Sequence, residues 1–191
     1  MKRLHRDDLY AWSVFDEARN IDFNSLCWVR PQGNVVIDPL PLSPHDAAHL
    51  ASLGPVAVVI VTNSDHLRNS AVLAEAHDAR LCGPAAEGLE GVEGLRDGDE
   101  VVPGLTVLEL HGSKTPGELA LLLEGDTLIT GDLIRSHAGG RLHRLPEPKL
   151  TDVDAARASI QRLADLPVQA VLVGDGYPVF HDGQARLREL L

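Results

Sequence analysis

The sequence has few cysteines, no long apolar run and no excess of positive charge. Its 191 residues contain two cysteines, Cys27 and Cys82, and no Cys-x-x-Cys pair. That count excludes a zinc-finger site and argues against a disulfide framework. Both cysteines have apolar, strand-like neighbours, so we expect two buried thiols.

Two further absences bear on location and partners. No stretch of 18 apolar residues exists, and the segment 1–8 lacks the apolar core of a signal peptide, so we expect a cytoplasmic protein with no membrane partner. The formal net charge is -11. This acidity argues against nucleic acid or an anionic membrane as a partner, because both select basic surfaces.

What remains is an ordinary globular composition, with 44 % apolar and 24 % charged residues. The length suffices for one domain with a sizeable core, so we predict a single domain over residues 1–191. No internal repeat divides the chain.

The apolar pattern predicts alternating runs of strands and helices. Strands are expected at residues 25–30, 34–38, 56–62, 80–82, 105–110, 118–123, 127–130 and 168–173. Helices are expected at residues 44–53, 65–78, 153–166 and 183–191. Ser43 with Pro44 caps the first helix, and Thr151 opens a capping box for the third. Hairpins at 25–38 and 105–130 favour sheets with helices on their outer faces over the competing doubly wound α/β domain.

Five polar segments follow predicted strands, where α/β proteins form their sites. They are Asp38, Asn63-Ser64-Asp65-His66, His111 to Glu118, Thr130-Gly131-Asp132 and Gly174-Asp175-Gly176. Each also has a purely structural interpretation as a helix cap or a turn. Carboxylates and an imidazole are, however, suitable ligands for Zn, Mn or Fe.

The order and spacing of these segments resemble the metallo-β-lactamase fold family, from about residue 20 to the end of the chain. Asp65-His66, Thr115-Pro116-Gly117 and Thr130-Gly131-Asp132 match that family's motifs. The resemblance implies an α/β (α+β) fold, an αββα sandwich of two mixed β-sheets with helices on the outer faces. It also implies metal-dependent hydrolysis.

The chain departs from the family's motif at four ligand positions. Val61, Asn63 and Lys114 stand where the first metal's histidines would be, and none of them is a convincing ligand. Asp175 stands in place of the last histidine and is ligand-capable. The resemblance then implies a second-metal site that is still complete, formed by Asp65, His66, Asp132 and Asp175. Such a site would hold one divalent metal, Zn, Mn or Fe. The alternative is that the protein has lost its metals altogether.

Lys114 has several possible roles at this half-emptied site. Its ammonium could lie between Asp65 and Asp132 and replace a cation. It could polarise a substrate oxygen, act as a base if burial lowers its pKa, or form only a structural salt bridge. We take Asp65 and Lys114 as the candidate catalytic residues.

Other polar residues are candidates for substrate binding. Residues 135–145 form a basic, Gly-rich segment, predicted as a loop, that could attract an anionic small molecule. His111 and His181 are spare imidazoles. We assign substrate binding to Asn63, His137 and His181.

Three functions are compatible with these residues. The first is hydrolysis of an ester, thioester, amide or phosphoester by water activated at a single metal. The second is a metal-free binding or scaffold protein in which Lys114 replaces a cation. The third is a metal-free enzyme that uses Lys114 with Asp65 or Asp132. The sequence specifies neither the substrate nor the oligomeric state.

Overall fold

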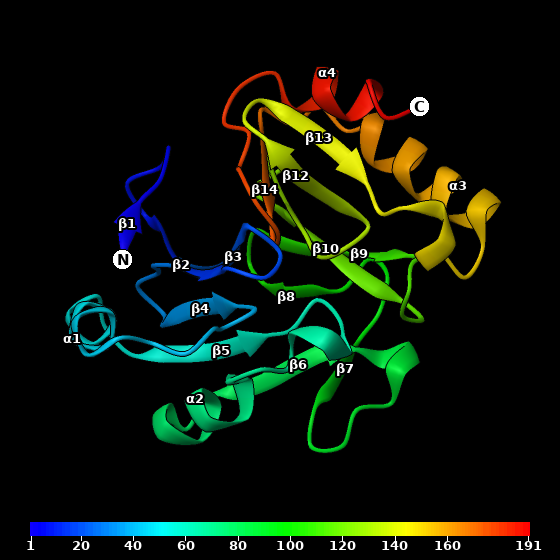
Figure 1. Ribbon diagram of the computed structural model, residues 1–191. Helices are drawn as coiled ribbons and strands as arrows, with labels where there is room; N and C mark the ends of the chain where they lie inside the picture. Colours follow the sequence, from blue (N-terminus) through cyan, green and yellow to red (C-terminus); the bar gives the residue numbers. More distant parts are fainter.

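Two β-sheets lie face to face, with helices on both outer faces, in the computed structural model of residues 1–191 (Figure 1). The predicted αββα sandwich is therefore confirmed. In the first sheet the strands follow chain order: β1 (Lys2–Arg3), β2 (Leu9–Asp16), β3 (Ile21–Trp28), β4 (Asn34–Ile37), β5 (Val56–Ile60), β6 (Arg80–Pro84) and β7 (Glu93–Leu95). The pairs from β1 to β4 are antiparallel and those from β4 to β7 are parallel.

The second sheet is also mixed. Its order is β14 (Ala170–Val173), β11 (Thr127–Thr130), β10 (Glu118–Leu123), β9 (Leu105–Leu110) and β8 (Glu100–Val102). Only β11 and β14 pair in parallel. A separate hairpin of β12 (Ile134–Ala138) and β13 (Arg141–Arg144) follows β11. This hairpin corrects the expectation of a loop at residues 135–145.

Apolar residues that alternate along the strands divide the core into three clusters. Along β10, Leu119 and Leu121 face the first sheet, whereas Ala120 belongs to the cluster under the outer helices. The period of two in side-chain direction produces this division. The third cluster joins the first sheet to its own helices. Cys27 and Cys82 are buried free thiols, as expected, and burial raises their pKa values to about 12 and about 11.

The four α-helices cover the two outer faces of the sandwich, two on each side (Figure 1). They are α1 (Pro44–Ser52) and α2 (Ser70–His77) on the first sheet, and α3 (Val153–Ala164) and α4 (Gly183–Arg188) on the second. The Ser43 hydroxyl accepts from the Asp46 amide, as the predicted cap requires. The third helix is capped by Asp152 rather than Thr151, because the Asp152 carboxylate accepts from the Ala155 amide.

The second helix starts later than predicted. Residues Ser64–His66 form a short 3-10 turn, and α2 begins only at Ser70. Arg68 interrupts the helix, because its φ of 33° lies in the left-handed region. The consequence is functional: the Asp65-His66 pair lies on a tight turn at the end of β5 rather than inside a helix.

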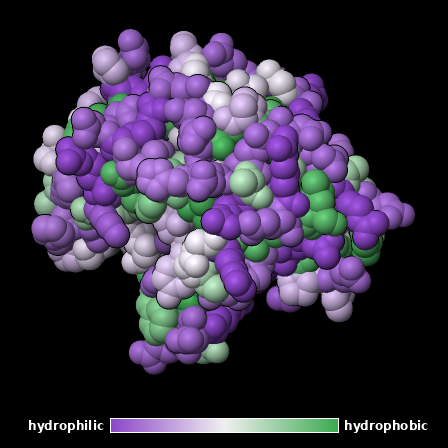
Figure 2. Space-filling view, turned by 90° about the horizontal axis from the view of Figure 1, so that it is seen from above, coloured by the Kyte–Doolittle hydropathy of each residue, from purple (hydrophilic) through white to green (hydrophobic).

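The surface seen from above is mainly hydrophilic, with small scattered apolar areas (Figure 2). None of the helices has the length and apolar character needed to span a bilayer.

The packing between the two sheets gives a first prediction. Leu121 on the central strand β10 has no exposed surface, so Leu121→Ala should lower the free energy of unfolding by about 2–5 kcal/mol. Val72→Ala is the control, since Val72 on α2 is 64 % exposed and should change stability by no more than about 0.5 kcal/mol. Urea unfolding followed by circular dichroism measures both. Equal effects of the two substitutions would contradict this account of the core.

Candidate functional site

The candidate site lies where parallel strands of both sheets end. Asp38 follows β4 and Thr62 follows β5 in the first sheet, while Asp132 and Asp175 follow β11 and β14 in the second. Three backbone hydrogen bonds of 2.8 Å join the sheets at this end: Leu119 N donates to Thr62 O, Asn24 N to Gly174 O and Gly176 N to Asp22 O. The topology therefore brings four polar strand ends to one place.

Two glycines allow the close approach of these strand ends. A Cβ at Gly131 would lie 2.8 Å from the Thr62 hydroxyl, and one at Gly174 would lie 3.1 Å from the His66 ring. Each glycine directly precedes an aspartate of the site. Any side chain here would push the aspartates away from the first sheet.

His66 is held by the first sheet. Its Nδ1 lies 2.8 Å from Asp38 Oδ2 and 2.9 Å from the Thr62 hydroxyl, which itself donates to Asp38 at 2.7 Å. Burial opposes protonation of His66, but the Asp38 carboxylate outweighs it and raises the His66 pKa. With Nδ1 engaged, Nε2 faces the second sheet and lies 3.5 Å from Asp132 Oδ2. A carboxylate behind a histidine orients the ring in this way at many metal sites.

Asp132 Oδ2 is the most heavily contacted atom of the site. It accepts from Asn63 Nδ2 at 2.9 Å and from Lys114 Nζ at 2.9 Å. Burial opposes ionisation of Asp132, but His66 and Lys114 outweigh it and lower the pKa. Asp132 is therefore a buried carboxylate that stays charged because its neighbours are cations and donors.

Lys114 lies where the sequence suggested. Its Nζ is 2.6 Å from Asp65 Oδ2 and 2.9 Å from Asp132 Oδ2. Burial lowers the Lys114 pKa, but the hydrogen bonds to the two carboxylates outweigh it and raise the value. A raised pKa corrects the suggestion that Lys114 acts as a base, because the side chain remains a cation at neutral pH.

Asp175 supplies an unused ligand atom. Its Oδ1 is buried and has no hydrogen-bond partner, and burial together with the charge of Asp132 raises its pKa. Ligand atoms of His66, Asp132 and Asp175 all lie within 4.8 Å of one another. One imidazole and two carboxylates, with one oxygen unsatisfied, fit a single divalent cation.

The remaining motif residues lie outside this group of three. Asp65 is 56 % exposed and faces Lys114 rather than the group. Val61 has no exposed surface and belongs to the packing between β5 and β6, where its amide donates to Cys82 O. Asn63 is equally buried, and its Oδ1 has no partner.

A pocket of about 400 Å³ opens onto the site. The residues that line it come from four parts of the chain: Asp16, Arg19, Phe23, Asp65, His66, Arg68, Lys114 and Asp132. None of the three residues assigned to substrate binding is among them.

The three histidines His111, His137 and His181 all lie outside the pocket, at different places in the fold. His137 is exposed on β12, where burial and Arg135 lower its pKa while Asp175 acts in the opposite direction. His181 lies near His5, which contacts Thr127 at the opposite end of β11 from Asp132. His111 is exposed beside α3 and its backbone amide donates to Ser159. Only His137 is near the group of three.

Sequence reasoning missed several residues of the site. Asp38 was noticed as a strand end, but its contact with His66 was not. Glu118, next to the Thr-Pro-Gly segment, is fully buried and accepts from Leu133 N at 2.8 Å and from the Ser113 hydroxyl. Arg68 could have been noticed as a cation two residues after His66; Phe23 had no signal in the sequence.

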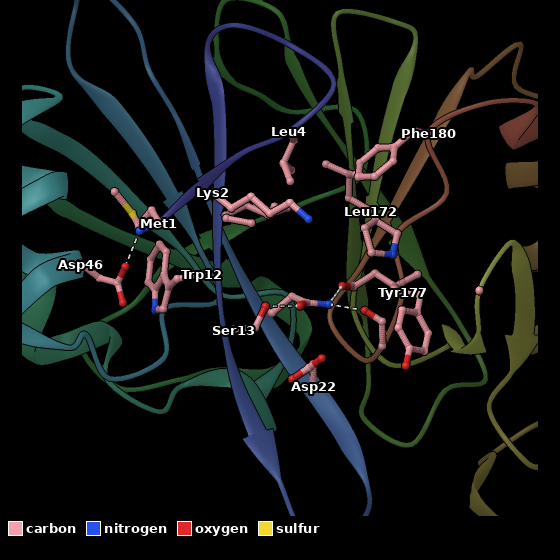
Figure 3. A pocket seen from close by; sticks show the side chains of 17 residues that line it. Met1, Lys2, Leu4, Trp12, Ser13, Asp22, Asp46, Leu172, Tyr177 and Phe180 are labelled. Atoms are coloured by element: carbon pink, nitrogen blue, oxygen red, sulfur yellow. Dashed lines mark hydrogen bonds and ion pairs between the residues drawn. The ribbon is translucent and has the colours of Figure 1, made fainter.

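A second pocket is larger but chemically different. It measures about 630 Å³ and lies between β1–β3 and the segment from Leu172 to Phe180 (Figure 3). About half of the residues that line it are apolar, and no histidine or cysteine is among them. Asn24 closes one side, because its amide donates to the carbonyls of Val173 and Gly176. The smaller pocket is therefore the one that combines a histidine with several carboxylates.

Comparison with known proteins agrees with this architecture. The family model of the metallo-beta-lactamase superfamily matches residues 1–191. None of the curated proteins compared with the chain matches it.

Several solved structures share the fold. A metallo-beta-lactamase from Pontibacter korlensis has a TM-score of 0.75 at 18 % identity, covering 97 % of this chain and 94 % of its own. A metallo-beta-lactamase family protein from Thermus thermophilus has a TM-score of 0.72 at 20 % identity, covering 96 % and 78 %. ETHE1 from Myxococcus xanthus has a TM-score of 0.65 at 25 % identity, covering 88 % and 76 %.

The buried Glu118 gives a prediction about pH. Burial and the charge of Asp132 raise its pKa from 4.5 to about 7. A carboxyl group whose pKa is higher in the folded protein than in the unfolded chain stabilises the fold at pH values below the unfolded-chain pKa. This contribution is lost as the pH rises to the folded-state pKa of about 7. The stability of the original protein relative to Glu118→Gln should therefore fall between these two pH values and then level off.

Urea unfolding of chelator-treated protein at a series of pH values measures this difference. Glu90→Gln, at an exposed position, is the control and should show little pH dependence relative to the original protein. A relative stability that rises across the same range would contradict the assignment.

Proposed function

Because the chain belongs to the metallo-beta-lactamase superfamily, we propose that it is a hydrolase with one metal site, formed by His66, Asp132 and Asp175. The substrate is a small molecule with an ester, thioester, amide or phosphoester bond. When bound, a divalent Zn, Mn or Fe ion would lower the pKa of water and so supply the nucleophile near neutral pH.

The observation that carries the proposal is the arrangement around His66. Asp38 and Thr62 hold Nδ1, so Nε2 is directed toward Asp132 Oδ2. The unpartnered Oδ1 of Asp175 completes the group of three. An unsatisfied buried carboxylate oxygen costs about 1–3 kcal/mol or more, and a cation in this position would remove that cost.

Lys114 supplies a second positive charge. Its ammonium lies 2.9 Å from Asp132 and lines the pocket, so it can stabilise negative charge that develops on the substrate's carbonyl or phosphoryl oxygen. A preorganised cation in such a position typically contributes a factor of about 10²–10³ to the rate. Lys114 therefore performs the electrophilic part of the work for which related sites would use another ion.

Asp65 is the residue best placed to accept a proton. It is more exposed than Asp132, lines the pocket and is fixed by Lys114 at 2.6 Å. In the proposed step the oxygen of water bonds to the substrate's carbon or phosphorus while Asp65 takes one of its protons. The bond to the leaving group then breaks, and Asp65 returns the proton to the leaving group as it departs, which regenerates the carboxylate.

One observation favours a second candidate function. Lys114 already neutralises Asp65 and Asp132, so the carboxylates can stay together without an ion. The corresponding proposal is a metal-free binding or scaffold protein with a degenerate site. In that case no activity depends on Asp65 or His66, and chelation has no effect on stability.

Metal content separates the two. If the first proposal is correct, untagged protein purified without chelator contains close to one divalent ion per chain by elemental analysis. Asp175→Asn should lose it, because the amide offers a weaker ligand. Asp7→Asn is the control, since Asp7 is 94 % exposed, and should retain the ion.

Stability provides the independent measurement. Chelator should lower the melting temperature by roughly 5 °C or more. A metal ion at a free concentration of about 100 times its Kd stabilises the folded protein by about 2.7 kcal/mol, and chelation removes this contribution. Only trace metal, no uptake on reconstitution and an unchanged melting temperature would together support the scaffold protein instead.

A fourth prediction concerns Lys114. With a panel of chromogenic esters and phosphoesters, Lys114→Met should lower kcat by about 100-fold or more, whereas Lys114→Arg keeps the charge and should retain part of the rate. Lys149→Met, at an exposed position, is the control. Activity that depends on Lys114 but survives complete chelation would point to a metal-free enzyme.

A further inference from the structure

The pocket contains two arginines that the chemistry above does not use. Arg19 lies in the turn between β2 and β3, and Arg68 lies between the 3-10 turn and α2. Both guanidinium groups are over the ring of Phe23, at 5.5 Å for Arg19 and 5.1 Å for Arg68. Because cations are attracted to an aromatic face, Phe23 holds both charges at the pocket.

Arg68 lacks the partners that a partly buried arginine usually has. None of the ion pairs at the site includes it. Its Nη1 is buried without a hydrogen-bond partner. Its backbone is also in the left-handed region, with φ at 33°, which is costly for a long side chain. An unsatisfied donor on a strained residue that faces a pocket indicates a missing acceptor.

The charges around the pocket indicate what that acceptor is. Asp65 and Asp132 are both bound to Lys114. Asp16 accepts from the backbone amide of Arg19 at 3.0 Å and lies 3.9 Å from its Nε. Among the side chains that line the pocket, Arg68 is the cation that forms no ion pair with a carboxylate, so its donors remain available to an anion.

We propose that Arg68, assisted by Arg19, binds an oxyanion of the substrate, a carboxylate or a phosphate. The planar guanidinium can donate two parallel hydrogen bonds to such a group. The reacting bond of the same molecule would lie at Lys114 and Asp132, which line the same pocket of about 400 Å³. This inference rests on the proposed function and adds the substrate class: small anionic molecules with a second, hydrolysable group.

The test measures anion binding without catalysis. Inorganic phosphate and acetate are titrated separately into chelator-treated full-length protein, and binding is followed by calorimetry and by the amide NMR signals of the pocket residues. At least one anion should bind saturably in the millimolar range, and more weakly as NaCl increases. The one that binds more tightly identifies the group as phosphate or carboxylate.

Substitutions then assign the binding to Arg68. Arg68→Met keeps a long side chain against Phe23 but removes the donors, so the affinity should fall by about tenfold or more. Arg68→Lys keeps the charge without the planar guanidinium, so its affinity for the anion should lie between those of the original protein and Arg68→Met. Arg157→Met removes an exposed charge from α3 and should change the affinity less than about twofold. Arg19→Met should weaken binding by a smaller factor than Arg68→Met.

Each result bears on the proposal in one direction. Failure of both anions to bind, or equal affinity in Arg68→Met and the original protein, overturns it. If circular dichroism shows that Arg68→Met does not fold, Arg68→Lys and Arg19→Met test the proposal instead. Unchanged anion affinity in both variants then overturns the proposal. Anion binding with no metal and no hydrolysis would contradict the proposed function alone, whereas hydrolysis of neutral esters without anion binding would contradict the present inference alone.

Discussion

The carboxylate of Asp132 is the point on which both sheets and the site depend. It follows a strand of the second sheet, yet its Oδ2 accepts from Asn63 after the first sheet and from Lys114 in the loop between β9 and β10. A buried charge without such partners costs several kcal/mol. Lys114 neutralises this group, while Asp38 and Thr62 hold His66 Nδ1 so that Nε2 is directed toward it. The contacts that keep Asp132 charged thus also fix its position beside His66 and Asp175, the group from which the metal site is proposed.

Much of the fold could be predicted because its signals are local. Strands at 105–110, 118–123 and 127–130 coincide with β9, β10 and β11, since apolar runs bounded by glycine turns define them. The hairpin of β12 and β13 was missed because its strands are polar and partly exposed. The early start predicted for α2 was wrong because the left-handed backbone at Arg68 reflects its surroundings rather than its own preference.

The residues of the site also fall into those that the sequence could predict and those that it could not. Lys114 could be placed between Asp65 and Asp132 because three motifs with known order bring those residues together. Phe23 and the guanidinium groups above it could not be placed, since their contact depends on how the β2–β3 hairpin folds over the pocket. The assignment of Asn63 and His181 to substrate binding followed residue type alone, and burial or distance separates both from the pocket. Spacing therefore locates reactive groups better than it locates the groups that recognise a substrate.

The strand β3 has a further effect through its backbone. Besides pairing with β2 and β4, it reaches the second sheet, where Asn24 N donates to Gly174 O and Phe23 forms a bridge with Asp175. Val179 pairs with Val171 along the same outer side of β14. The strand β14 lies at the edge of its sheet and has the apolar sequence Ala-Val-Leu-Val. When the backbone groups of such an edge strand are free, they can pair with a strand of another molecule. The bridge between Val171 and Val179 covers part of that edge with the chain's own backbone, which leaves fewer free backbone groups there for a strand of another molecule.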